Sequence, residues 1–239
     1  MTARDRRDQI LAAAIGLFAE NGFRGTTTKQ LAAGAGITEP VLYRHFKTKG
    51  DLYAAIIEQK AQEGLSQAAK QLGPYLGGDD DEGFLTALAE LIVDCYHQDP
   101  AYVRLLLFSA LERHELSDLF FERHVLAFYQ MVGGYLRRRM REGAIRQLDP
   151  NLAARLFLGM IHHHSLVGAL FGEKIVRASR KTFVRELVQT FLGGVASNRG
   201  DGRARAESYH DELDSGALPA SPLLDRLFEA GDRGGQHRG

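Results

Sequence analysis

The chain has 239 residues, enough for one large domain or two of modest size. Lys plus Arg and Asp plus Glu each total 30, so the formal charge is zero, which argues against a polybasic coat for nucleic acid. The single cysteine, Cys95, excludes an intramolecular disulfide, and no apolar run approaches the roughly 20 residues that a membrane-spanning helix needs.

The first predicted helix covers about residues 3–21 and carries an apolar stripe at helical spacing. Asn21-Gly22 ends it, since glycine adopts the left-handed angles of a helix C-cap at little steric cost. Three arginines, Arg4, Arg6 and Arg7, stand at its start, where reaching DNA phosphates and remaining on the solvated surface are both open. Residues 1–60 hold nine Lys or Arg against six Asp or Glu, a local net charge of +3.

Residues 27–46 predict two short helices joined by a tight turn. The first follows a threonine cap, Thr27 or Thr28, and the second follows Thr38, with Pro40 in its first turn. The intervening Gly34-Ala35-Gly36 breaks the helical pattern, and Leu42 and Phe46, four residues apart, point to a core. Two helices and a glycine-containing turn are typical of the helix-turn-helix, whose second helix enters the major groove.

Cationic and hydroxyl side chains remain on the outward side of this motif and are the candidate DNA contacts. The alternative to DNA binding is that these side chains form an ordinary solvent-exposed face of a capped helix pair. The candidates are Thr27, Thr28, Lys29, Thr38, Glu39, Val41, Tyr43, Arg44, His45, Lys47 and Lys49.

Four stretches occur together here in fixed order: Gly22-Phe23, Thr26-Thr27-Thr28, Ala35-Gly36-Ile37-Thr38 and the run from Leu42 to Lys49. In residue type and spacing, the first 60 or so residues resemble the TetR family of bacterial transcriptional regulators. The resemblance implies that Tyr43, Thr28, His45 and Lys49 hold phosphates, and that Arg44, Val41 and Thr38 lie nearest the bases. Glu39-Pro40 departs from the family pattern, in which a small or basic pair is frequent.

The rest of the chain predicts six more helices, so the expected fold is all-α with about nine helices. A connecting helix at 50–72 precedes a glycine-rich acidic loop at 73–83, and further helices follow at about 84–97, 100–113, 116–142, 150–171 and 179–192. The predicted domains are a DNA-binding domain at 1–49, a ligand-binding and dimerisation domain at 50–195, and a mostly flexible tail at 196–239.

Aromatic and histidine side chains cluster inside the later apolar helices. A small, largely apolar ligand needs such a lining, although any one of these residues is more often plain core. The TetR resemblance implies an inducer cavity among these helices. The candidate ligand contacts are Tyr96, Phe108, Phe120, His124, Phe128, Met160, His163 and His164.

Three consecutive histidines, His162 to His164, are candidate metal ligands. Adjacent residues point about 100° apart on a helix, so they cannot all bind one ion while it stays helical. We therefore expect no metal site and no cofactor. A histidine-based metal-dependent enzyme stays a minor alternative, because the sequence contains no His-x-x-x-His and no nucleophile or phosphate-loop motif that would favour a catalytic site.

The helices at about 151–171 and 179–192 are apolar nearly all round, so one face of each must be buried against something else. The TetR resemblance implies that these helices pair two chains into a homodimer. The sequence thus predicts a cytoplasmic, sequence-specific DNA-binding regulator, a repressor released from operator DNA by a small-molecule inducer. It is not expected to be an enzyme or to bind membranes, and the other alternative is a helical protein-interaction adaptor.

Overall fold

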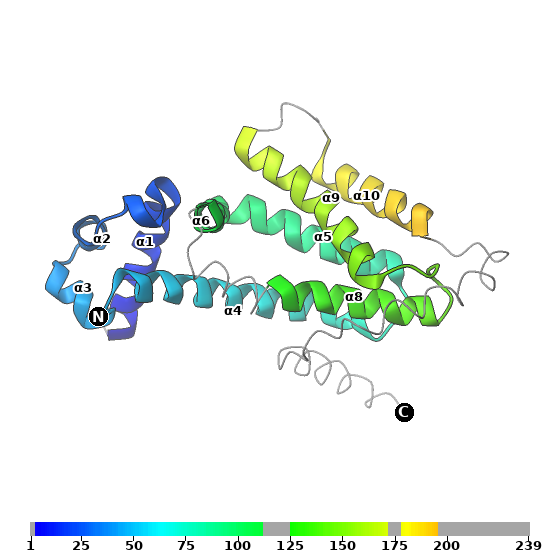
Figure 1. Cartoon of the computed structure of the whole chain (residues 1–239), viewed down its shortest axis with the longest axis horizontal. Helices are drawn as coiled ribbons and strands as arrows, with labels where there is room; N and C mark the ends of the chain where they lie inside the picture. The colour runs from blue at the N-terminus through cyan, green and yellow to red at the C-terminus, as the bar shows by residue number, and fades with distance from the viewer. Residues whose placement is uncertain (1–2, 112–124, 172–177, 196–239) are drawn as a thin grey trace. The chain divides into compact units, whose positions relative to one another are not determined.

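The computed structural model describes residues 3–111, 125–171 and 178–195, and its regular elements there are all α-helices (Figure 1). They are α1 Ala3–Gly25, α2 Thr28–Gly34, α3 Glu39–His45, α4 Lys49–Leu76, α5 Asp81–Gln98, α6 Pro100–Leu111, α8 Leu126–Arg141, α9 Pro150–Phe171 and α10 Arg180–Val195. The predicted all-α class is confirmed. The start of the predicted helix at 116–142 and the tail at 196–239 lie outside the described residues.

The described residues divide into two compact units. One, here called the head unit, takes residues from the ranges 1–66 and 95–124, and the other, the body unit, from 67–94 and 125–239. This division differs from the predicted boundary after residue 49. The first half of α4 and all of α6 belong to the head unit, because Tyr102 and Leu105 of α6 are buried in the same core as α1.

The core of the head unit is built on the stripe that the sequence predicts along α1. Ile10 and Phe18 are fully buried there, and the Phe18 ring meets the Tyr53 ring edge-on at 4.9 Å. The Tyr53 hydroxyl donates to the carbonyl oxygen of Leu105 at 3.0 Å, which satisfies a buried polar group. Arg104 of α6 donates to the carbonyl oxygen of Ala19 at 3.3 Å, so α6 is tied to both α4 and α1.

The core of the body unit centres on the packing of α8 against α9. Phe157, Leu158 and Ile161 of α9 are fully buried. Val132 and Leu136 of α8 are fully buried as well. Side chains from both helices therefore pack into one apolar core.

The segment from 73 to 83 is mostly helical, so the predicted long loop is wrong. α4 continues through Pro74 to Leu76, and α5 begins at Asp81. Contacts with α8, which the composition of this segment does not reveal, account for the difference between the predicted loop and the observed helices. Arg138 of α8 donates to the carbonyl oxygens of Leu76 and Gly78 and so satisfies groups left open at the end of α4.

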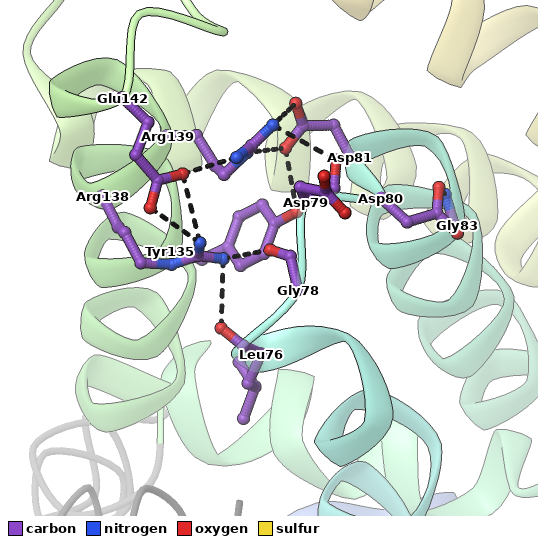
Figure 2. A network of polar contacts seen from close by, with 10 residues as sticks. All are labelled: Leu76, Gly78, Asp79, Asp80, Asp81, Gly83, Tyr135, Arg138, Arg139 and Glu142. Atoms are coloured by element: carbon purple, nitrogen blue, oxygen red, sulfur yellow. Dashed lines mark hydrogen bonds and ion pairs between the residues drawn. The ribbon is translucent and has the colours of Figure 1, made fainter. Parts of the chain in front are cut away.

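Figure 2 shows the arginine clamp, here defined as Arg138 and Arg139 with their partners around the α4–α5 connection. Arg139 Nε lies 2.7 Å from Asp81 Oδ1, and its guanidinium also pairs with Glu142. The Tyr135 hydroxyl donates to the same Asp81 oxygen at 2.8 Å. The hydrogen bond to the Asp81 carboxylate raises the pKa of Arg139. The pKa of Tyr135 is also raised, mainly by burial and secondly by the hydrogen bond that Tyr135 donates to Asp81.

Candidate nucleic-acid interface

The start of α2 is fixed by two adjacent threonines with different roles. Thr26 is fully buried, and its hydroxyl donates to the carbonyl oxygen of Gly22 at 2.7 Å, just where α1 kinks at φ 70°. Thr27 is the N-cap: its hydroxyl oxygen accepts the Gln30 N–H at 3.2 Å, while the Gln30 side chain accepts the Thr27 N–H at 2.8 Å. This reciprocal capping box orients α2.

The turn between α2 and α3 uses Gly36 at φ 65°, a backbone angle that favours glycine. The Ile37 N–H donates to the carbonyl oxygen of Ala32 at 2.9 Å and closes the turn. From α1, the Gln9 amide donates to the carbonyl oxygen of Ala35 at 3.3 Å. The predicted helix-turn-helix geometry is therefore present and is braced by α1.

α3 has one buried and one exposed face. Leu42 is buried within the helix, and Phe46, its C-cap, is buried just beyond it. The exposed residues are Tyr43, Arg44 and Lys47, and 45 % of the surface area of Tyr43 is accessible to solvent. An exposed aromatic hydroxyl beside two cations, on a short helix held from behind by an apolar core, can present hydrogen-bond donors to duplex DNA.

The other predicted DNA contacts divide between exposed and half-buried positions. Thr27, Lys29 and Thr38 are exposed. Thr38 stands at the N-cap of α3 as predicted, but its side chain makes no capping hydrogen bond. Half-buried positions are Thr28, Glu39, Val41, His45 and Lys49.

Lys49 has an internal role that the sequence does not reveal. Its ammonium donates to the carbonyl oxygens of Phe23 and Thr26 at 2.8 and 2.9 Å. The same charge lies 4.3 Å from the centroid of the Phe23 ring, a cation–π contact. Lys49 therefore ties the start of α4 to the connection between α1 and α2, and its role as a phosphate contact stays a prediction.

The predicted ligand contacts do not fall in one compact unit. Tyr96 and Phe108 are half-buried in the head unit, and Phe128 is half-buried on α8 in the body unit. Phe120 and His124 lie outside the described residues. Whether these side chains meet a common ligand stays a prediction.

The three consecutive histidines of α9 occupy three different surroundings. His163 is exposed and shares the outward face of α9 with Met160. The His164 ring stacks on the Phe183 ring of α10, with centroids 3.6 Å apart and planes 11° apart. Burial lowers the pKa of His162. Within the described residues, no three His, Cys, Asp or Glu side chains gather in a way that could hold a metal ion.

Two matches to family models cover most of the helices described above. Residues 10–56, from α1 into α4, match the model for bacterial regulatory proteins of the tetR family. Residues 83–194 match the C-terminal domain of AefR-like transcriptional repressors. The nucleoid occlusion factor SlmA of Haemophilus ducreyi is 30% identical over 166 residues, which cover 65% of this chain and 77% of that protein.

The chain belongs to the TetR family of bacterial regulatory proteins. The resemblance inferred from the sequence is thereby confirmed, and the protein is a DNA-binding transcriptional regulator. A TetR-family protein explains the residue pattern of the head unit, which the adaptor alternative leaves without a reason. Within the part of the chain that the structure describes, no helix is long and apolar enough to cross a membrane.

Solved structures share this TetR fold at low sequence identity. The ketosteroid regulator KstR2 of Mycobacterium tuberculosis aligns with a TM-score of 0.62 and 21% identity, covering 82% of this chain and 97% of that one. The fatty acid degradation regulator FadR of Bacillus halodurans aligns with a TM-score of 0.60 and 22% identity, covering 81% and 98%. At such identities the likeness establishes the fold alone.

Proposed function

We propose that the protein acts as a homodimeric repressor that reads a nearly palindromic operator with the exposed face of α3. The observation that carries the proposal is the contrast between the two faces of this region: Leu42 and Phe46 are buried, while Tyr43 and Arg44 are exposed. A two-fold dimer sets two such helices in successive major grooves, about 34–36 Å apart.

Within each α3, Arg44 is the proposed base-reading residue. A guanidinium can bind the O6 and N7 acceptors of guanine with two parallel hydrogen bonds, which makes it selective for that base. Thr38 and Val41 are proposed to lie nearest the neighbouring bases. Tyr43 and Lys47 are proposed to hold phosphates, which fix the register of the helix and carry no sequence information.

The contacts around α3 complete the proposed interface. Thr27, Thr28 and Lys29 at the start of α2 are proposed to meet the sugar-phosphate backbone, since backbone N–H groups and cations at a helix start favour anions. His45 and Lys49 are proposed phosphate contacts on the other side. Glu39 is the exception, because a carboxylate there repels phosphate and can only accept hydrogen bonds, as from a cytosine amino group.

The dimer surface is proposed to centre on α9. The large apolar side chains exposed on α9, together with His163, form what we call the α9 stripe: Leu152, Leu156, Met160, His163, Leu170 and Phe171. The first three recur every four residues and so share one face of the helix. Leu152, Leu156 and Leu170 each expose more than half of their area, an apolar surface that a second copy of the chain can cover.

α10 is proposed to flank this interface rather than to form its apolar centre. Phe183 is half-buried, while Val184, Leu187, Val188 and Phe191 are buried within the chain. The exposed positions of α10 include Arg185, Glu186, Gln189 and Thr190. The sequence expectation of a free apolar face therefore applies to α9 but not to α10.

The proposed control is release from DNA by a small, largely apolar ligand bound in the cytoplasm. The family model matched by residues 83–194 describes AefR-like repressors, and the two named structural neighbours are regulators linked to ketosteroids and fatty acids. Release requires only that the ligand bind one conformational state more tightly, with a coupling of about 1–3 kcal/mol.

The test is footprinting of the purified chain on DNA upstream of its own gene and on genomic fragments. The proposal predicts a protected site with two inverted half-sites, and transcription from that promoter should rise when the gene is deleted. Protection of a single half-site would rule out the dimer, and a fall in transcription after deletion would show activation instead of repression.

A further inference from the structure

Near the start of α1, an arginine lies against the end of α3. The guanidinium carbon of Arg7 lies 4.4 Å from the centroid of the Phe46 ring, and Phe46 is the C-cap residue of α3. In Figure 1 the start of α1 lies beside the end of α3. Phe46 is only 4 % exposed, whereas Arg7 is exposed, so the guanidinium lies over the ring on its solvent side.

This contact fixes the position of a charge without using its hydrogen-bond donors. A cation over an aromatic face is attracted by the ring quadrupole, and a planar guanidinium lies flat on it. The five N–H groups of arginine lie in the guanidinium plane and point outward from its edge. Arg7 can therefore hydrogen-bond a phosphate while the Phe46 ring holds it in place.

Its neighbour Arg6 has a different arrangement. Arg6 donates to the Gln9 side-chain oxygen at 2.9 Å, and the Gln9 amide donates in turn to the carbonyl oxygen of Ala35. This chain of contacts links Arg6 to the turn between α2 and α3. The sequence alone does not distinguish these two adjacent arginines. In the structure, Arg7 contacts the Phe46 ring, whereas Arg6 is hydrogen-bonded to Gln9.

We propose that Arg7 is a DNA phosphate contact, held by Phe46 beside the end of α3. The proposal rests on the proposed reading of DNA by α3 and adds a contact from a different helix. Because Phe46 is the C-cap residue of α3, its ring places the Arg7 guanidinium at the end of the helix that presents Tyr43 and Arg44.

Such a contact predicts a specific pattern of salt dependence. Each phosphate neutralised on duplex DNA contributes about 0.9 to the slope of log K against log salt. Loss of Arg7 from both protomers of a dimer should lower that slope by about 1.8. Because phosphates carry no sequence information, affinity should fall by the same factor on specific and on shuffled DNA.

The experiment measures fluorescence anisotropy over a salt series on two duplexes of equal length. One duplex is selected by the wild-type protein from a random pool, and the other has the same bases shuffled. The variants are Arg7→Ala, Arg7→Lys and, as a matched loss of charge on α8, Arg137→Ala. Thermal unfolding of each variant checks that the head unit stays folded.

We expect Arg7→Ala to lower the slope on both duplexes, while Arg7→Lys keeps most of the slope and Arg137→Ala keeps all of it. In a Phe46→Leu background, which keeps an apolar side chain but removes the ring, Arg7→Ala should weaken binding by a smaller factor. That non-additivity separates a held contact from a diffuse effect of charge.

An unchanged slope in Arg7→Ala, with wild-type protein binding both duplexes, overturns the proposal. A loss confined to the selected duplex also overturns it, because Arg7 would then be reading bases. If the wild-type protein selects no duplex from the random pool, the proposed DNA reading fails first, and that outcome is distinguishable from both others.

Discussion

The ammonium of Lys49 lies 2.8 Å from the carbonyl oxygen of Phe23 and 4.3 Å from the centroid of the same residue's ring. One side chain at the start of α4 therefore holds the connection that follows the kink of α1. A lysine that bound only phosphate would show no such internal contacts. Its main contribution is expected to be to the stability of the head unit.

We predict that Lys49→Met lowers the free energy of unfolding by about 1.5–3 kcal/mol, the range for hydrogen bonds to a charged group. Lys47→Met, which alters an exposed lysine two residues earlier, should leave that energy within about 0.5 kcal/mol. Urea unfolding followed by circular dichroism measures both. If Lys49→Met unfolds at the wild-type urea concentration, the internal contacts of Lys49 contribute no stability.

The arginine clamp predicts that Arg139 contributes strongly to the free energy of unfolding, although it is distant in sequence from the α4–α5 connection that it contacts. Arg139→Met leaves the Asp81 carboxylate largely buried without its ion pair, and removal of one partner from such a pair costs about 3–5 kcal/mol. Arg137→Met on the exposed side of the same helix is the control. Calorimetry should show a much lower melting temperature for Arg139→Met alone, and equal melting temperatures would show that the clamp contributes no stability.

The α9 stripe predicts which surface holds two chains together. Leu156→Glu places a carboxylate in the middle of the proposed apolar interface, where burial of an unpaired charge is strongly unfavourable. Sedimentation should show a dimer for wild type and a folded monomer for this variant. Gln62→Glu, an equal change on the exposed side of α4, should remain dimeric, and a dimeric Leu156→Glu protein would place the interface elsewhere.

His162 predicts how stability depends on pH. Burial lowers the pKa of His162 below its usual value of 6.5, so the folded chain binds fewer protons than the unfolded chain below that pH. Its contribution is therefore complete above about pH 6.5 and is lost as the pH falls through the unfolded value toward the lower folded one.

Unfolding by urea at pH 7.5 and 5.5 measures this effect. The wild-type protein should lose stability at the lower pH, and His162→Gln should lose less. Gln98→Ala, which changes an exposed and uncharged residue of α5, should retain the wild-type dependence on pH. An identical pH dependence in wild type and His162→Gln would exclude His162 as the source.

Local signals in the sequence predicted the helix-turn-helix well because its stability is largely local. The capping threonine, the glycine at positive φ and the four-residue spacing of Leu42 and Phe46 all act within a few residues. The Asp99 and Asp149 caps are of the same kind: each carboxylate accepts N–H groups two or three residues later. Such patterns require no knowledge of distant parts of the chain.

Features that depend on distant contacts cannot be predicted from local sequence patterns. The helical extension through Pro74 depends on Arg138, more than 60 residues away, and the sequence offers no signal for that pairing. The assignment of α6 to the head unit depends on Tyr53 meeting Leu105. The roles of Arg7 and Lys49 depend on the rings of Phe46 and Phe23, which approach them only in the folded state. The sequence shows that both residues are cationic, but it does not show that an aromatic ring holds each of them in place.

The candidate ligand contacts were the hardest to place from the sequence. Aromatic and histidine residues on apolar helices fill a core, line a cavity or cover an interface, and all three uses share one periodicity. Met160 and His163 illustrate the difficulty, since both fall on the exposed α9 stripe. His164, one residue further, stacks on Phe183 inside the body unit.

Arg44 is proposed to read DNA bases from α3, and its binding to a set of altered duplexes tests this role. Binding of wild type and Arg44→Ala is compared on the selected duplex, on variants of it changed at each base pair, and on the shuffled duplex. Arg44→Ala should lose about 1–3 kcal/mol of binding free energy on the selected duplex, should no longer discriminate at one base pair, and should bind shuffled DNA nearly as wild type does. Equal losses on selected and shuffled DNA, with discrimination intact at every base pair, would contradict this role.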